Sequence, residues 1–243
     1  MIILAMDTAT SATSVALSLG EGAVLRDRDD PAPGGHPGHA TRLLPMAAGL
    51  LAGAGLRWED VERLAVGLGP GTFTGLRVGV ATARGLAQSL GVPLVGFSSL
   101  AALARPAARD PSSPGHVLSV IDARRGEVFA AVHRATAACD LYELAPPRAV
   151  DPERLQEVLA EAGVNAAAGG VLAVGDGAVR YRDASERLAH VPPDASPLHL
   201  VEAAEGGALS ESGDAGALAE VLPDYRRRPD AEITLAATGG GGR

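Results

Sequence analysis

A glycine-rich run constrains this chain more than any other segment. Residues 67–79 read GLGPGTFTGLRVG; they follow a short apolar stretch at Leu64–Gly67 and continue into apolar residues at helical spacing. Glycine is the usual residue where a backbone must turn sharply or approach another group closely. The run therefore predicts a strand, a tight turn and a helix over roughly residues 75–90, in that order.

Composition limits what can surround this unit. Hydrophobic residues make up 47% of the 243 positions and aromatic residues only 3%, so the core must consist of Ala, Leu and Val. The single cysteine, Cys139, excludes an internal disulfide and fits a reducing compartment. A net charge of −8 argues against broad binding of a phosphate backbone. Asp7 interrupts the apolar start, and no apolar stretch is long enough to span a membrane, so we expect a cytoplasmic protein.

Apolar periodicity predicts the remaining elements and two lobes. Further strands are expected at residues 2–6, 13–19, 23–28, 92–96, 117–122, 127–133 and 171–174. Further helices are expected at residues 39–52, 98–104 and 196–205, and another begins with Asp151 as its N-cap. Arg105–Gly115, rich in Pro, Ser and Ala, is interpreted as a linker. We therefore expect an N-terminal lobe at 1–105 with helix 196–206 packed back on it, a smaller lobe at 106–195, and a segment 207–243 whose tail from residue 239 is disordered.

Two of these helices carry candidate interface residues. The apolar arc of helix 39–52 is too wide for one buried face, and small residues recur every four positions in helix 75–90. Small residues let another backbone approach closely, and the spacing leaves open whether that backbone is the chain's own sheet or another subunit. The candidate interface residues are Leu43, Met46, Leu50, Gly75, Leu76, Gly79, Val80 and Ala83.

Six segments together resemble the bacterial TsaB (YeaZ) family. They are LAMDTAT at 4–10, HATRLLP at 39–45, GPGTFTGLRVG at 69–79, GVPLVGFSS at 91–99, IDARRGEV at 121–128 and PDYRR at 223–227. The resemblance covers about residues 1–230 and implies an α/β fold of the actin/hexokinase/Hsp70-like (ASKHA) class, with a mixed sheet flanked by helices in each lobe. It also implies a role in making threonylcarbamoyladenosine beside the tRNA anticodon, as partner of the catalytic homologue TsaD and the ATPase TsaE.

Whether the chain catalyses a reaction depends on its own residues. ATPases of this superfamily carry Asp-x-Gly in the first hairpin, where the glycine lets backbone amides close on a phosphate. Here the hairpin reads Asp7-Thr8-Ala9-Thr10, and we expect Asp7 to cap the turn. Two metal-binding histidines of the TsaD relatives correspond to Ser99 and Leu103, so we expect the metal site to be absent.

These observations favour a non-catalytic subunit, with no catalytic residue, no cofactor and no metal. The expected partners are TsaD and TsaE, a second copy of the chain when TsaD is absent, and tRNA only through the complex, with no membrane involved. An active ATP-dependent phosphotransferase of the sugar-kinase type and a proteolytic or regulatory homodimer remain open as alternatives. The sequence contains no Gly-x-Ser-x-Gly elbow, no Gly-x-Gly-x-x-Gly order and no P-loop.

Two further groups of residues are weaker candidates for a site. His36 and His39 lie in sequence near Asp29 and Asp30 and could form a metal site, although a solvated loop explains them as well. The basic candidates for contact with tRNA are Arg124, Arg125 and Arg226–Arg228. The sequence leaves open weak nucleotide binding between the lobes and the way in which TsaE docks.

Overall fold

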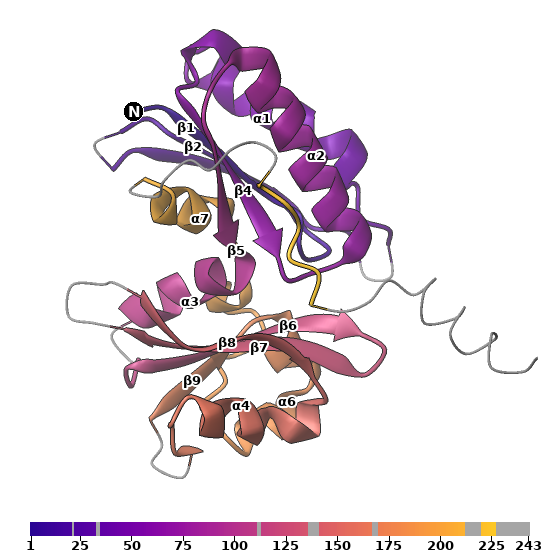
Figure 1. Ribbon diagram of the computed structural model, residues 1–243, viewed down its shortest axis with the longest axis vertical. Helices are drawn as coiled ribbons and strands as arrows, with labels where there is room; N and C mark the ends of the chain where they lie inside the picture. Colours follow the sequence, from indigo (N-terminus) through magenta and orange to yellow (C-terminus); the bar gives the residue numbers. More distant parts are fainter. Residues whose placement is uncertain are drawn as a thin grey trace, which may run out of the picture.

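The computed structural model contains two mixed β-sheets, with helices between them and on both outer faces (Figure 1). It describes residues 1–20, 22–32, 35–110, 113–135, 141–166, 170–211 and 220–226. The strand order is β3-β2-β1-β4-β5 in the first sheet and β8-β7-β6-β9 in the second. The strands are β1 (Ile3–Asp7), β2 (Thr13–Ser18), β3 (Val24–Asp29), β4 (Arg63–Gly69), β5 (Leu94–Ser98), β6 (His116–Arg124), β7 (Glu127–Ala135), β8 (Leu141–Val150) and β9 (Val171–Val174). The expected two-lobed α/β fold class is thus confirmed.

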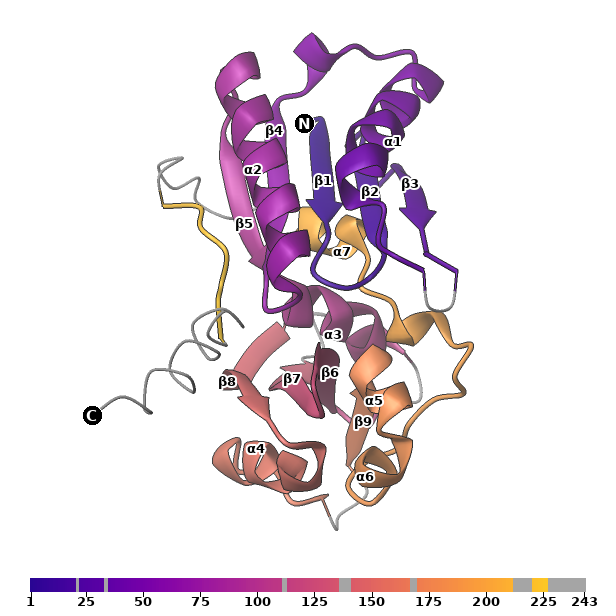
Figure 2. The ribbon, with the colours of Figure 1, turned by 90° about the vertical axis from the view of Figure 1, so that its right-hand side faces the viewer.

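The helices form layers on these sheets. Helices α1 (His39–Gly53) and α2 (Phe73–Leu90) cover the outer face of the first sheet, and α7 (Ala203–Leu209) covers its inner face. Helix α3 (Ser99–Arg109) lies between the two sheets. Beyond the second sheet lie α4 (Leu155–Glu161) and α6 (Arg182–Glu186), and α5 (Asp176–Arg180) packs beside the end of β6 (Figure 2). Single 3-10 turns occur at η1 (Trp58–Asp60), η2 (Pro152–Arg154) and η4 (Pro197–His199).

The two sheets repeat one arrangement. In the first, β1, β2 and β3 run antiparallel in sequence and β1 pairs in parallel with β4; in the second, β6, β7, β8 and β9 do the same. At or near the end of each leading strand, β1 and β6, an aspartate carboxylate accepts a hydrogen bond from the amide two residues later. The bond is 2.8 Å for Asp7 with Ala9 and 2.9 Å for Asp122 with Arg124. The two hairpins therefore share one aspartate–amide contact, although the connection between their strands differs in length.

One apolar core joins the two sheets through α3. This core contains Ala5 and Phe97 of the first sheet, Leu103 of α3, and Ile121 and Phe129 of the second sheet, all buried. Helix α3 continues to Arg109 rather than ending at Ala104, because Ala104 and Ala107 are buried against the same core. The linker expected from Arg105 is thus helical over its first five residues, 105–109. The division into lobes 1–105 and 106–195 stays a prediction.

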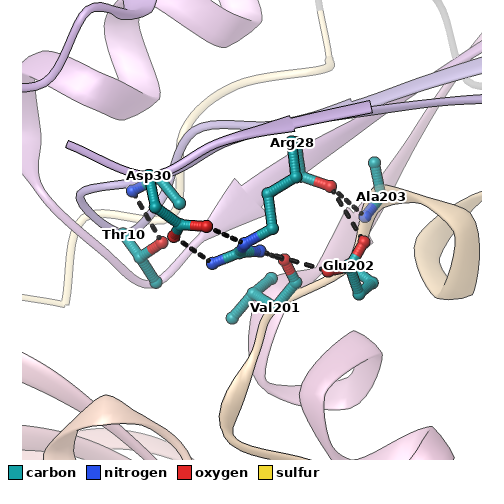
Figure 3. Close-up of polar contacts among 8 residues, drawn as sticks. Thr10, Arg28, Asp30, Val201, Glu202 and Ala203 are labelled. Carbon is teal, nitrogen blue, oxygen red and sulfur yellow. Dashed lines mark hydrogen bonds and ion pairs between the residues drawn. The ribbon is translucent and has the colours of Figure 1, made fainter. Parts of the chain in front are cut away.

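The prediction of a single helix at residues 196–205 is wrong. Ser196 caps the 3-10 turn η4, the backbone is extended at Leu200 and at Glu202, and α7 begins only at Ala203. Arg28 of β3 explains the break, because its guanidinium donates to the Val201 carbonyl at 2.8 Å and lies 3.3 Å from the Glu202 carboxylate (Figure 3). The carbonyl is therefore bonded to β3 instead of to a helix. Helix α7 does pack back on the first sheet.

The other expected elements agree with the structure to within two residues at each end, and Asp151 caps its helix through a 2.9 Å bond from the Glu153 amide. Strand β8 was not expected from the sequence. It is an edge strand containing Pro146 and Pro147, in the position where a sheet tolerates proline. The predicted tail from residue 239 and Cys139 lie outside the described residues. No helix in the described ranges is long and apolar enough to cross a membrane.

Candidate functional site

The candidate site lies where the parallel strands β1, β4 and β5 end. Asp7 closes β1, the glycine-rich loop Gly67–Thr72 leads from the end of β4 into α2, and Ser99 follows β5 as the first residue of α3. The carboxyl ends of parallel strands are where open α/β sheets bind ligands. A phosphate cradle, if this chain had one, would therefore lie among these residues.

The Asp7 carboxylate is buried and both its oxygens are hydrogen-bonded. Oδ1 accepts from the Ala9 amide at 2.8 Å and Oδ2 accepts from the Ser99 hydroxyl at 2.6 Å. Burial raises the pKa of Asp7, and these two hydrogen bonds oppose the shift. Gly67 faces this carboxylate so closely that a Cβ there would lie 1.9 Å from Oδ2. Asp7 thus caps its turn, as the sequence predicted, and packs against glycine.

The glycine-rich loop is closed onto the first hairpin. The Thr72 amide, at the start of α2, donates to the Ala9 carbonyl at 2.7 Å. A Cβ on Gly71 would lie 2.3 Å from that same carbonyl oxygen. The N-terminus of a helix is a natural site for an anion because its first amides lack partners within the helix. Here a backbone carbonyl of the chain takes the place that a phosphate oxygen would need.

The two positions aligned with metal-binding histidines face the interior. Ser99 is fully buried and bonded to Asp7, and Leu103 is a core residue of α3. His39 begins α1 and is buried, with its Nδ1 2.9 Å from the Thr13 hydroxyl, and burial lowers its pKa. His36 is exposed.

The constellation around the two histidines is not assembled into a site. Asp29 pairs with Arg42 at 3.0 Å and Asp30 pairs with Arg28 at 2.8 Å. Across the parts of the chain that the structure describes, no three His, Cys, Asp or Glu side chains are grouped to hold a metal ion. The aspartates near His36 and His39 in sequence thus serve as partners for arginine.

The candidate interface residues pack inside the protomer, apart from one. Leu50 is half-buried, whereas the other seven are buried. A Cβ on Gly75 would lie 2.0 Å from the Thr8 carbonyl, and one on Gly79 would lie 2.3 Å from the Thr8 hydroxyl oxygen. Gly75 and Gly79 of α2 therefore accommodate the chain's own first hairpin, and the contact of these helices with another subunit stays a prediction. Leu43 and Met46 of α1 likewise belong to the apolar core beneath the helix.

The outward surface of α1 and α2 is made of other residues than the buried candidates of the same helices. Leu44 is 45% exposed, and Pro45 beside it is exposed too. On α2 the exposed positions include Arg77, Ala81 and Gly85. Helices α1 and α2 lie side by side on one face of the sheet (Figures 1 and 2), and we refer to their exposed residues together as the outer layer.

The basic candidates are dispersed. Arg124 and Arg125 form the turn between β6 and β7, with φ of 65° and 54°, in the left-handed region that side chains seldom adopt. The Arg124 guanidinium lies 3.3 Å from the Asp122 carboxylate, and Arg226 lies 2.7 Å from Asp224. Residues 227 and 228 lie outside the described part of the chain.

Sequence reasoning missed a cluster at the start of α2. The Arg77 guanidinium lies 3.7 Å from the centre of the Phe73 ring, and its Nε donates to the Tyr225 hydroxyl at 3.1 Å. The rings of Phe73 and Tyr225 are 5.1 Å apart. The Asp224 amide fixes this late segment by donating to the Leu68 carbonyl at 2.8 Å. The available signal was the scarcity of aromatic residues, which makes Tyr225, two residues after a proline, stand out in the late segment.

Comparisons with known proteins agree with this architecture. Residues 35–169 match the family described as TsaD: tRNA N6-adenosine threonylcarbamoyltransferase. The tRNA threonylcarbamoyladenosine biosynthesis protein TsaB of Escherichia coli (strain K12) is 42% identical over 134 residues, and that of Haemophilus influenzae is 38% identical over 157 residues. These matches span 53% and 64% of each relative's own length, and the same shares of this chain.

A solved structure extends the likeness to nearly the whole chain. YeaZ from Pseudomonas aeruginosa superimposes with a TM-score of 0.71 at 30% identity, covering 92% of this chain and all of its own. This likeness in structure extends over nearly the full length of the chain, and the matched TsaB sequences agree with it. The chain belongs to the TsaB (YeaZ) family.

Proposed function

We propose that this chain is a non-catalytic subunit in the biosynthesis of threonylcarbamoyladenosine in tRNA. The support for the pathway is that the similar proteins of Escherichia coli and Haemophilus influenzae are named as tRNA threonylcarbamoyladenosine biosynthesis proteins. The observation that carries the non-catalytic role is the closed cradle, in which the Ala9 carbonyl accepts from the amide of Thr72, the N-cap residue just before α2. In this proposal the chain works in the cytoplasm, beside a TsaD-family protein that performs the transfer and a TsaE-family ATPase.

The chemistry of Asp7 supports the same proposal. An aspartate that orients metal-bound water needs an ionised carboxylate with free lone pairs directed at the ligand. Asp7 is buried, its two oxygens already accept bonds from Ala9 and Ser99, and burial raises its pKa. Its side chain is therefore suited to holding the hairpin and poorly suited to binding Mg²⁺ and phosphate.

The outer layer of α1 and α2 is the proposed docking surface for the TsaD-family protein. The match of residues 35–169 to the TsaD family means that both partners would contain this helix pair, so a pseudo-symmetric pairing of like surfaces is available. The contact would be made by outward residues such as Leu44 and Ala81 rather than by the buried candidates of the same helices. The same surface would join two copies of this chain when the TsaD-family protein is absent.

The experiment is complementation of cells depleted of this chain, with threonylcarbamoyladenosine in bulk tRNA measured by mass spectrometry. Asp7→Asn should restore the modification as fully as the unaltered chain, because the amide oxygen can accept from the Ala9 amide and the amide nitrogen can donate to the Ser99 hydroxyl. Leu44→Asp should weaken binding to the TsaD-family protein by more than about tenfold, as expected for a buried contact at an interface centre. The matched control is Leu25→Asp, which alters a leucine 37% exposed on the edge strand β3.

Two results would contradict the proposal. If a folded Asp7→Asn chain accumulates normally but restores no modification, the phosphotransferase alternative takes its place. If Leu44→Asp and Leu25→Asp bind the TsaD-family protein equally well, the docking surface lies elsewhere.

A further inference from the structure

The two helices of the proposed docking surface contain no acidic residue. Neither α1 nor α2 includes an aspartate or a glutamate, although the chain has 29 acidic against 21 basic residues. Their basic residues, His39 aside, are Arg42, Arg77 and Arg84. The outer layer is thus positively charged in a protein whose net charge is −8.

Arg77 and Arg84 differ from most other arginines of the chain in their ion pairs. Arg42 forms an ion pair with Asp29. Elsewhere in the chain, Arg109 pairs with Glu205 and Arg148 pairs with Glu161. By contrast, no carboxylate among the described residues lies within ion-pair distance of Arg77 or Arg84. Since they are seven residues apart on one helix, their side chains project on the same side. This side of α2 carries two positive charges that the protomer does not neutralise.

Arg77 is also held in place before any partner arrives. Its guanidinium lies over the Phe73 ring, and the Tyr225 hydroxyl accepts the hydrogen bond from its Nε. The two Nη groups remain as donors, and Arg77 is exposed. Ordering a long side chain on binding costs free energy, and a side chain that is ordered beforehand avoids that cost. The late segment around Tyr225 therefore holds the Arg77 guanidinium in position at the edge of the docking surface.

We propose that Arg77 and Arg84 bind carboxylates on the TsaD-family protein and disfavour a second copy of this chain on the same surface. The inference rests on the proposed function and adds the chemistry of the partner, whose facing helix must carry acidic residues. In a two-fold homodimer through α1 and α2, the arginines of one copy would face a helix pair that also lacks acidic residues. Like charges placed together at an interface suppress the wrong partner.

The experiment measures binding between the full-length chain and the full-length TsaD-family protein of the same genome by titration calorimetry, at low and high sodium chloride. Arg77→Gln and Arg84→Gln should each raise Kd by about tenfold at low salt, and the difference should shrink at high salt. The matched control is Arg134→Gln, since Arg134 is exposed on β7, stacks on Tyr142 and also has no carboxylate partner in the described ranges. This control should leave Kd within about twofold of the original, because a charge distant from the interface is screened.

Self-association gives an independent readout. Light scattering at low salt should show tighter homodimers for the Arg77→Gln/Arg84→Gln variant than for the unaltered chain, and added salt should strengthen the homodimer of the unaltered chain. Unchanged thermal unfolding of each variant shows that the fold is kept.

The outcomes separate the inference from the proposal beneath it. If the unaltered chain forms no complex with the TsaD-family protein at any salt concentration, the proposed pairing fails. If the complex forms and both arginine variants behave like Arg134→Gln, the pairing stands and the charge inference is overturned. Weaker homodimers in the double variant would overturn the exclusion of a second copy.

Discussion

Alanine in place of Gly79 should destabilise the isolated protein, yet stabilise it once Thr8 is also alanine. In the middle of a helix, alanine is favoured over glycine by about 1 kcal/mol. At Gly79, however, the new Cβ would lie 2.3 Å from the Thr8 hydroxyl oxygen, which donates to the Gly75 carbonyl at 2.8 Å. The hydroxyl must move and lose that buried bond, at about 1–3 kcal/mol, and the crowding adds about 1–3 kcal/mol.

The net effect of Gly79→Ala is therefore a loss of about 3 kcal/mol. In a Thr8→Ala background the clash disappears, because the Thr8 Cβ lies 3.6 Å from the new methyl group, an ordinary contact. The same substitution should then gain about 1 kcal/mol. Whether Gly79→Ala stabilises or destabilises the chain thus depends on a residue that is 71 positions away in the sequence.

Urea unfolding followed by fluorescence of the single tryptophan, Trp58, measures all four members of this cycle. A loss of about 3 kcal/mol lowers the urea midpoint by roughly 1 M. Gly85→Ala is the control, since nothing lies within 4 Å of the Cβ it would add, and it should stabilise the chain whichever residue occupies position 8. If Gly79→Ala is as stabilising as Gly85→Ala, Thr8 does not fill this space and the packing of α2 on the hairpin has been misassigned.

Two further predictions concern buried positions. Burial raises the pKa of Asp7 above the ordinary 3.8, so its stabilising contribution is complete below that pH and is lost as pH rises through the folded-state pKa. Asp7→Asn should therefore gain stability over the unaltered chain as pH increases from about 4, and a pH-independent difference in unfolding free energy would contradict this assignment. Gly206→Ala should cost about 2–3 kcal/mol, because its Cβ would lie 2.2 Å from the Phe97 ring. Phe97→Leu should recover part of that loss in the same urea assay, and no recovery would show that α7 does not rest on this ring.

Sequence patterns predicted most of the fold because the strands and long helices carry their own periodicity. They failed where a distant residue decides the local structure. Leu200–Glu202 has helix-forming neighbours, but Arg28 of β3 bonds the Val201 carbonyl, and no local pattern contains that partner. Strand β8 was hidden by Pro146 and Pro147, which are compatible with an edge strand only once the strand order is known.

In the candidate site, too, features set by the local sequence were predictable and features set by distant residues were not. The role of Asp7 as a turn cap was predictable because Ala9 stands where an open cradle needs glycine. The burial of Gly75, Gly79 and Ala83 was not, since a small-residue stripe has the same spacing whether it meets the chain's own hairpin or another subunit. Thr8, which fills the space beside Gly79, could be identified only from the folded arrangement.

The core shared by the two sheets has a consequence for folding. Leu103 on α3 and its buried neighbours form one core with apolar side chains of both sheets. If α3 moved away from either sheet, the inner face of that sheet would be exposed to solvent. The two halves therefore depend on each other for solvent exclusion and should melt in one cooperative transition. Loose halves that swing apart to admit and release a substrate would have to break this core in every cycle. A rigid body of this kind is better suited to presenting a constant surface to another protein.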